Sequence, residues 1–258
     1  MAEPKTNIER QKIIVICGPT ASGKSSVAMK MAEEFKAEIV SADSMQIYRH
    51  MDIGTAKPTK ADRLKVAHHM VDHVEPDEPY SAARYREEAS EAIEQIGLQK
   101  KNVIVCGGSG LYIRVLTKGI FTGPERDAEY RKELKEEAFN KGTDVLHQRL
   151  KAVDPVYAEK IHPNNLVRIT RALEVFHASG RPFSDFHAEH AFTESPFDTL
   201  MLYMSMPRKE LYERINARAE EMIEAGLVDE TRALIEMGYT EDLKPMSALG
   251  YKEMTMFI

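Results

Sequence analysis

Three short apolar runs in the first half of the chain predict buried β-strands. They span residues 13–17, 37–42 and 102–106. Each run ends directly before a glycine or an aspartate, and the continuous apolar run at 102–106 is typical of a strand covered on both faces. Helical spacing of apolar residues predicts helices over 26–35 and 80–96, the second with Ser81 as its N-cap, and a third begins at 111–113. Strands that alternate with helices predict a parallel sheet with right-handed crossovers.

The pattern changes after Gly119, because no strand-like alternation occurs from residue 123 to about 196. Helices are expected in that stretch at about 128–140, 144–151 and 166–178. Pro155 and Pro163 interrupt them, and Gly180 closes the last one. A strand at 199–206 and helices at about 208–225 and 228–237 are expected to follow. The chain therefore predicts an α/β core, formed by residues 1–122 and 197–258, and an all-helical insertion domain at 123–196.

Composition narrows the class of protein only slightly. The chain has 258 residues and a formal net charge of −6, which argues against a broad, non-specific nucleic-acid surface but leaves room for a local basic groove. Cys17 and Cys106 end two predicted strands and are expected to be buried thiols in a reducing compartment. The polar N-terminus is unlike a signal peptide, and no apolar run approaches the length of a membrane span. We expect a cytoplasmic monomer with no membrane partner.

The run GPTASGKS, between the first predicted strand and the first predicted helix, has the spacing of a phosphate loop. Its glycines let successive backbone N–H groups point at one anion, and the following helix adds the positive end of its dipole. Lys24 supplies a charge for phosphate oxygens, and Ser25 offers a hydroxyl to Mg²⁺. The predicted site comprises Gly18, Pro19, Thr20, Ala21, Ser22, Gly23, Lys24 and Ser25. The core is therefore expected to be a P-loop NTPase-like parallel sheet flanked by helices, which binds a polyphosphate or pyrophosphate.

Further motifs follow in a fixed order. They are SADSMQIYRHMDIGTAKP at 41–58, GGSGLY at 107–112, IHPNNLVRITRALEV at 161–175, PRKELYERI at 207–215 and LGYKE at 249–253. Together with the phosphate loop, they resemble the tRNA dimethylallyltransferase family, also called tRNA isopentenyltransferase, over nearly the whole chain. The motifs at 41–58 and 161–175 are the most specific, because the phosphate loop alone would also fit many nucleotide kinases.

The resemblance implies transfer of a dimethylallyl group from dimethylallyl diphosphate to the exocyclic N6 amine of the adenosine next to the tRNA anticodon, with release of pyrophosphate. Asp43 matches the family's general base, which takes the proton of the amine as the C–N bond forms. Arg208 matches a position that meets the pyrophosphate, and Thr20 can donate its hydroxyl to the same oxygens. On sequence alone, Asp43 could instead form a turn and Arg208 could be a solvated helix residue.

The resemblance also implies contacts with tRNA, whose target base must be flipped out of its stack. The implied contact residues are Asp43, Ser44, Met45, Gln46, Ser109, Arg131, Asn164, Asn165, Leu166, Val167, Arg168, Met246, Ser247, Ala248, Leu249, Gly250 and Tyr251. Ser44 and Gln46 could read base edges. Ser109 replaces the threonine usual in this turn but keeps the hydroxyl, and Arg131 and Arg168 could equally be surface arginines. His68 and His69 lack the spacing of a metal site and are expected to be structural.

Three other functions stay open at this point. They are a small-molecule kinase that uses ATP on the same loop, an isopentenyltransferase that acts on free adenylate, and a nucleotide-dependent RNA-binding module without catalysis. The large, nearly neutral insertion argues against a kinase lid, and a free nucleotide needs no clamp. Family members usually continue past LGYKE with a basic helical segment, whereas this sequence stops at Ile258. We therefore expect part of the tRNA-contacting surface to be missing from it.

Overall fold

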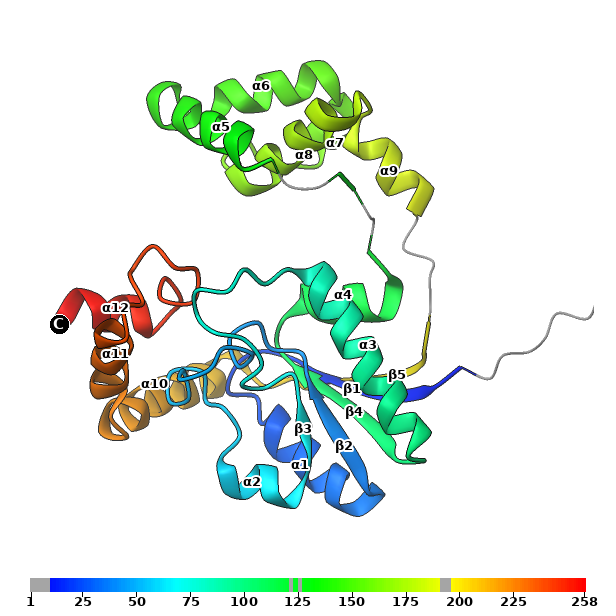
Figure 1. Cartoon of the computed structure of the whole chain (residues 1–258), viewed down its shortest axis with the longest axis vertical. Coiled ribbons are helices and arrows are strands. Elements are labelled where there is room, and N and C mark those ends of the chain that lie inside the picture. The colour runs from blue at the N-terminus through cyan, green and yellow to red at the C-terminus, as the bar shows by residue number, and fades with distance from the viewer. Residues whose placement is uncertain (1–9, 121–122, 125–126, 191–195) are drawn as a thin grey trace, which may run out of the picture. The chain divides into compact units, whose positions relative to one another are not determined.

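A computed structural model of the protein describes residues 10–120, 123–124, 127–190 and 196–258 (Figure 1). The chain forms two compact units, one of Met1–Gly119 with Glu194–Ile258 and one of Ile120–Thr193. Sequence analysis places the boundaries at 122/123 and 196/197. Residue 122 and the polar N-terminus up to residue 9 lie outside the described residues.

The first unit is built on one five-stranded sheet. Its strands are β1 (Lys12–Cys17), β2 (Ala37–Ser41), β3 (His68–His69), β4 (Asn102–Gly107) and β5 (Asp198–Tyr203). They lie in the order β3-β2-β4-β1-β5, and every neighbouring pair is parallel, which confirms the predicted parallel sheet. The expected strand at 199–206 is present as β5, which ends earlier, at Tyr203.

The register of the central strands places the ends of three strands at one rim. Cys17, the last residue of β1, pairs with Gly107 of β4, and Ser41, the last residue of β2, pairs with Cys106. The loops that follow β1, β2 and β4 therefore start side by side at the carboxyl edge of the sheet. In open parallel sheets this edge is where ligands bind.

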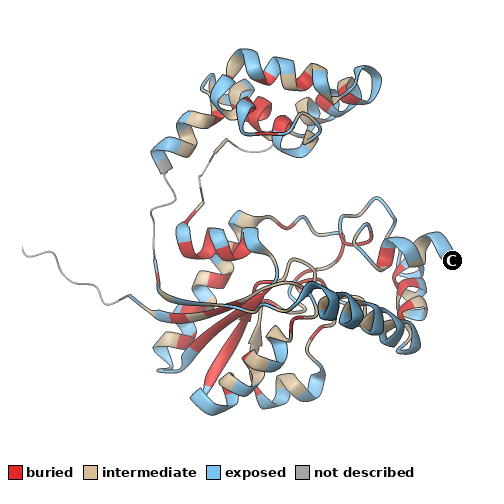
Figure 2. Ribbon diagram, turned by 180° about the vertical axis from the view of Figure 1, so that it is seen from behind, coloured by how far each residue is buried: buried red, intermediate tan, exposed pale blue. Residues whose placement is uncertain are grey.

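The helices of this unit are α1 (Lys24–Phe35), α2 (Lys60–Lys65), α3 (Ala82–Leu98), α4 (Gly110–Lys118), α10 (Arg208–Glu224), α11 (Leu227–Glu236) and α12 (Tyr251–Phe257). Three of them, α1, α3 and α4, cover the two faces of the sheet, whereas α10, α11 and α12 lie beside it (Figure 1). α1 packs against one face through Ala28 and Ala32, and α3 and α4 lie on the other (Figure 1). Ser81 caps α3 as predicted, because its side chain accepts a hydrogen bond from the N–H of Arg84. In Figure 2 the buried residues of this unit concentrate in the central strands and on the inner sides of the helices that pack against them.

The second unit contains helices but no strand within its described residues, 123–124 and 127–190, as predicted. The helices are α5 (Ala128–Lys141), α6 (Thr143–Val153), α7 (Pro155–Glu159), α8 (Leu166–Ser179) and α9 (Phe183–His190). Leu134, Leu146, Leu150 and Ile169 lie in its core and are almost completely buried. This unit therefore has a hydrophobic core of its own.

Pro155 interrupts the helices as predicted, because α6 ends at Val153. It also begins α7, which was not predicted: the first helical N–H needs no partner, and the Asp154 side chain caps the helix by accepting from the Tyr157 N–H at 2.9 Å. Other sequence-based expectations were wrong in detail. Phe35, the last apolar residue of the predicted helix 26–35, is 49% exposed, since α1 ends there and the chain turns at Lys36 in the left-handed region. Cys106 is buried, whereas Cys17 is only half-buried at the end of its strand. The short elements α2, α9 and β3 were not predicted.

His68 and His69 have structural partners, in line with their expected role. Nε2 of His69 lies 2.6 Å from Glu38 Oε2, and Nδ1 of His68 lies 2.8 Å from the Val66 carbonyl oxygen. Among the helices that the described residues form, none has both the length and the apolar character that crossing a membrane requires.

Candidate active site at the carboxyl edge of the sheet

The loop between β1 and α1 has a backbone that only this type of sequence allows. Gly18 and Gly23 have φ angles of 147° and 88°, in the region that favours glycine. A Cβ atom at Gly18 would also lie 2.5 Å from the carbonyl oxygen of Met204. Gly23 caps α1 without a side-chain hydrogen bond, so the first N–H groups of the helix are left for a ligand. This is the geometry of an anion-binding loop.

Two polar side chains of the loop fit an anion that is large and multiply charged. Ser22 is buried, and its Oγ has no hydrogen-bond partner within the described residues. Nζ of Lys24 donates to the carbonyl oxygen of Pro19 at 2.6 Å, and a Cβ at Gly108 would lie 4.0 Å from that Nζ. The turn after β4 thus lies beside the lysine. An orphaned buried hydroxyl is costly unless a ligand satisfies it, and phosphate oxygens would do so.

The electrostatic surroundings of Lys24 identify which other charges lie near it. Burial lowers the pKa of the Lys24 amine, and the positive charge of Arg218 lowers it further, while the charges of Cys106 and Asp43 oppose the shift. Asp43 and Arg218 are therefore close enough to interact with the amine of the phosphate loop. A lysine with a lowered pKa and a nearby carboxylate is a frequent feature of functional sites.

Asp43 follows β2 at the same rim and has one carboxylate oxygen engaged. Oδ1 accepts from the backbone N–H groups of Met45 at 2.9 Å and Gln46 at 3.4 Å. Within the described residues, Oδ2 accepts no hydrogen bond. The carboxylate thus forms the turn that its position suggested, yet it retains an oxygen for a proton from a substrate. The two sequence-based interpretations of Asp43 are compatible with each other.

The predicted base-reading residues beside Asp43 are tied to the protein itself. Nε2 of Gln46 donates to the carbonyl oxygens of Thr55 and Ala56 at 3.3 and 3.2 Å, and its Oε1 accepts from Ser41 Oγ at 3.1 Å. The Gln46 amide therefore holds the neighbouring loop in place. Ser109 Oγ accepts from the N–H of Ser44 at 2.9 Å, which joins the turn after β4 to the Asp43 turn.

Arg208, which the resemblance assigns to the pyrophosphate, has a partner within its own helix. It is exposed, and its Nε and Nη2 donate to the Tyr212 hydroxyl at 3.1 and 2.8 Å. Arg218, on the same helix, lies on the half-buried stripe of Leu211, Ile215, Arg218 and Met222, and its charge acts on Lys24. Sequence reasoning missed Arg218. Its spacing of three from Ile215 and four from Met222 would have placed it on the inward face of α10.

Only some side chains of the run 246–251 are accessible to a partner. Leu249 is 87% exposed and Ser247 is exposed, but Met246 and Tyr251 are buried. The Tyr251 hydroxyl donates to Glu230 Oε1 at 2.6 Å. Of the tRNA contacts implied for this run, Met246 and Tyr251 therefore have side chains that pack in the core.

In the second unit, Arg131 also has an internal partner. Its Nη2 lies 2.6 Å from Oε2 of Glu174, which is completely buried and also pairs with Arg171 at 2.9 Å. Glu174 Oε1 accepts from the N–H of Asp127 as well, so this carboxylate fastens the start of α5 to α8. Arg131 thus has a structural partner, which neither of its sequence-based interpretations, a tRNA contact or a surface arginine, included.

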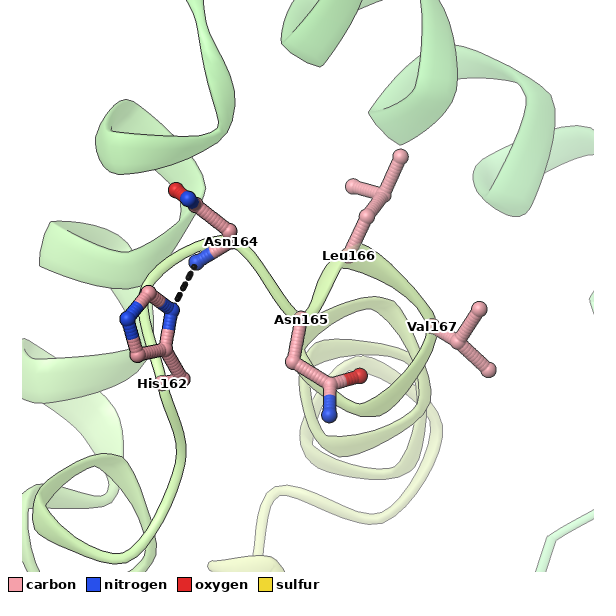
Figure 3. A pocket seen from close by; sticks show the side chains of 5 residues that line it. All are labelled: His162, Asn164, Asn165, Leu166 and Val167. Carbon is pink, nitrogen blue, oxygen red and sulfur yellow. Dashed lines mark hydrogen bonds between the residues drawn. The ribbon is translucent and has the colours of Figure 1, made fainter. Parts of the chain in front are cut away.

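The start of α8 lines an open cavity of about 380 Å³ (Figure 3). Its lining residues are His162, Asn164, Asn165, Leu166 and Val167, which include most of the contacts implied for this segment. Asn165 caps α8 by accepting from the N–H of Arg168 at 3.2 Å, and Asn164 donates its N–H to His162 Nδ1 at 3.2 Å. Val167 and Arg168 are exposed. The helix start is therefore both ordered and accessible.

The fold and the rim define a phosphate-loop-like α/β protein with a helical insertion and a carboxylate beside the loop. Comparison with known proteins then identifies its family. The model of the IPP transferase family matches residues 46–258. The tRNA dimethylallyltransferase 2 of Geotalea uraniireducens is 49% identical over 250 residues, which are 97% of this chain and 81% of that protein. The chain belongs to the IPP transferase family.

Solved structures agree with this assignment. The full-length tRNA isopentenylpyrophosphate transferase of Bacillus halodurans is 36% identical, with a TM-score of 0.67 over 96% of this chain and 77% of that one. A eukaryotic dimethylallyltransferase solved as it acts on tRNA is 30% identical, with a TM-score of 0.80 over 96% of this chain and 63% of that one. The resemblance seen in the motifs is therefore confirmed for the family and for the fold.

Proposed function

We propose that this protein transfers a dimethylallyl group from dimethylallyl diphosphate to the exocyclic N6 amine of the adenosine adjacent to the tRNA anticodon, and releases pyrophosphate. One observation carries the proposal: Asp43 follows β2 and the phosphate loop follows β1 at the same carboxyl edge of the sheet, so a base and a site for a diphosphate leaving group share one rim. Membership of the IPP transferase family supports the same reaction.

The loop between β1 and α1 stabilises the leaving group. As the C–O bond of the prenyl diphosphate breaks, its electron pair passes to the pyrophosphate oxygen, where charge develops. The N–H groups at the start of α1, the ammonium group of Lys24 and the orphaned Ser22 hydroxyl face that charge. Thr20 donates its hydroxyl to the same oxygens. Arg218, whose charge already acts on Lys24, is the arginine of α10 that we assign to the pyrophosphate.

Mg²⁺ fits this loop as a diphosphate-bound ion. Ser25 is exposed in the first turn of α1, and its hydroxyl would be a protein ligand. No group of three His, Cys, Asp or Glu side chains in the described part of the chain is arranged to hold a metal ion, so most ligands would be diphosphate oxygens and water. When bound, Mg²⁺ neutralises charge on the leaving group.

Asp43 serves the acceptor. The lone pair of an adenine amine is delocalised into the ring, which makes the amine a weak nucleophile. Oδ2 of Asp43 takes one of its protons while the C–N bond forms, and Oδ1 stays fixed by the Met45 and Gln46 N–H groups. A carboxylate held through one oxygen is oriented without being fully occupied, which suits a general base.

The tRNA is bound by exposed residues of both units. Asn164, Val167 and Arg168 line or flank the cavity at the start of α8, and Ser247 and Leu249 are the exposed side chains of the C-terminal run. The target adenosine leaves its stack to reach Asp43, as bases do in enzymes that modify them. We further propose that the protein acts in the cytoplasm as a monomer.

Transfer of labelled prenyl groups tests this function. Radiolabelled dimethylallyl diphosphate is incubated with Mg²⁺ and with an anticodon stem-loop RNA that has adenosines beside the anticodon, with AMP, or with no acceptor. Label in the RNA that is lost with Asp43→Asn but kept with Asp77→Asn, an exposed aspartate of the same unit, supports the proposal. Label in AMP alone would make the protein a free-nucleotide enzyme. ATP turnover without prenyl transfer would make it a kinase.

A further inference from the structure

A carboxylate from α11 lies in a concave arrangement of backbone N–H groups far from it in sequence. Oε2 of Glu230 accepts from the N–H groups of Asp52 and Ile53, each at 2.9 Å. Oε1 accepts from the N–H groups of Ile53 at 3.1 Å and Gly54 at 3.2 Å, and from the Tyr251 hydroxyl at 2.6 Å. Hydrogen bonds to an ionised carboxylate are roughly twice as strong as neutral ones. Glu230 is therefore the main anchor of the loop 52–54.

The same loop orients the turn that carries Asp43. Directly after Gly54, the carbonyl oxygens of Thr55 and Ala56 accept the two hydrogen bonds that Nε2 of Gln46 donates, at 3.3 and 3.2 Å. The backbone N–H of Gln46 in turn donates to Asp43 Oδ1. A continuous path of hydrogen bonds thus runs from Glu230 through the loop 52–56 and Gln46 to Asp43.

The loop has little freedom to relax without this anchor. A Cβ atom at Gly54 would lie 2.6 Å from the Tyr251 ring, so the ring packs directly on the loop backbone. Ala56 has a φ of 46°, a conformation that a residue with a Cβ adopts only when its surroundings enforce it. Loss of the anchor would let this residue return to an ordinary conformation and move the carbonyl oxygens that hold Gln46.

We propose that Glu230 is a positioning residue for the acceptor side of the reaction: it fixes the loop 52–56, and through Gln46 it fixes the Asp43 carboxylate relative to the incoming amine. This inference rests on the proposed prenyl transfer. Glu230 touches neither substrate, and its effect falls on the base rather than on the phosphate loop. Tyr251 ends the run that also exposes Ser247 and Leu249, so the acceptor-binding segment shares the same carboxylate.

Glu230→Gln tests this role. In the variant an NH₂ group replaces one carboxylate oxygen, so some backbone N–H groups of the loop face a donor and lose their acceptor. The matched control is Glu236→Gln, an exposed position on the same helix. We expect kcat for the stem-loop RNA to fall about 10- to 100-fold, as it does when a reacting group is misplaced by about an ångström. The KM for dimethylallyl diphosphate and the affinity for pyrophosphate should change by less than about twofold. Tyr251→Phe, which removes one donor and keeps the ring, should lower kcat about 3- to 10-fold.

The measurements of kcat and pyrophosphate affinity distinguish failure of the positioning role from failure of the proposed function. Wild-type kcat in Glu230→Gln, while the wild-type protein transfers label normally, would overturn the positioning role alone. A parallel loss of pyrophosphate affinity in Glu230→Gln and Tyr251→Phe would also overturn it, because the effect would then be general destabilisation. Partial recovery of kcat in Glu230→Asp supports the role, since a carboxylate is kept. A wild-type protein that transfers no label to any acceptor would overturn the proposed function itself and the positioning role with it.

Discussion

Lys24 donates a hydrogen bond of 2.6 Å from Nζ to the carbonyl oxygen of Pro19, five residues earlier in the same loop. The amine is thus held against the loop backbone and is partly buried there. Burial lowers its pKa, the charge of Arg218 acts in the same direction, and Cys106 and Asp43 oppose the shift. A pyrophosphate in the loop would compete with Pro19 for this amine, so binding of the anion must depend on whether Lys24 carries its proton.

As the pH rises, the affinity for pyrophosphate should therefore begin to decline at a lower pH than it would with a lysine of ordinary pKa. The anion binds the protonated amine, and the pKa of Lys24 in the free protein is lowered from its usual 10.5, so affinity declines as the pH rises through that lowered value. Lys24→Met should weaken binding about 10- to 100-fold at neutral pH, since hydrogen bonds to charged groups contribute about 1.5–3 kcal/mol. Isothermal titration at constant ionic strength measures both effects.

The control for this measurement is Lys30→Met, an exposed lysine of the same helix, which should keep the wild-type profile. Protonation of pyrophosphate itself affects both variants equally and cancels in their ratio. An identical decline with pH in wild type and in Lys24→Met would show that another group is responsible.

Arg218, and not Arg208, should matter for the leaving group. Arg208→Gln removes a side chain that is exposed and bound to Tyr212, so pyrophosphate affinity and prenyl transfer should change by less than about twofold. Arg218→Gln removes the charge that acts on Lys24 and should lower transfer about 10-fold or more. Steady-state kinetics with both variants decides between them. Equal losses, or a larger loss for Arg208→Gln, would contradict the assignment.

Local signals explain why much of the core could be predicted. Short apolar runs predicted the buried strands. Ser81 was predicted to cap α3, and its hydroxyl does accept a hydrogen bond from the N–H of Arg84. β3 escaped prediction because it has only the two residues His68 and His69, whose strand conformation depends on pairing with Ile39 and Val40 of β2. The interruption at Pro155 was predicted, but the helix α7 that begins there was not, because its cap is the side chain of Asp154, whose role is not evident from spacing alone.

Part of the candidate site could likewise be predicted from local signals, and part could not. The phosphate loop and Asp43 follow predicted strands directly, so the geometry of the parallel sheet brought them to one rim. The contacts of Glu230 with the loop 52–54 join positions that lie 176 to 178 residues apart. Sequence patterns report only on neighbouring residues, so they could not predict this pairing. Family resemblance assigned Gln46 and Tyr251 to tRNA, but the internal hydrogen bonds of their side chains appear only in the folded chain.

Glu38 should support the sheet in a pH-dependent way. Burial alone would raise the pKa of its carboxyl group, but hydrogen bonds from Lys101 and His69 outweigh burial, and the pKa lies below its ordinary 4.5. The stabilisation is therefore fully present above pH 4.5 and is lost as the pH falls through the lowered folded-state value. Glu38→Gln should reduce the free energy of unfolding by about 1–3 kcal/mol at neutral pH. Urea denaturation over a range of pH should show this difference shrinking in acid, and a constant difference would refute the linkage.

Asp154 should contribute strongly to the stability of the helical unit. It is buried, Oδ1 accepts from the N–H of Tyr157 at 2.9 Å, and Oδ2 accepts from the N–H of Ser184 at 2.8 Å. One carboxylate thus caps α7 and also fixes the first turn of α9, so its loss leaves buried N–H groups without partners. Asp154→Ala should cost about 2–4 kcal/mol, the sum of a lost helix cap and a second buried hydrogen bond. The control is Asp185→Ala, a change at an exposed position of α9. Urea unfolding followed by circular dichroism should show a lower free energy of unfolding only for Asp154→Ala. Equal stability of the two variants would mean that water replaces both hydrogen bonds without cost.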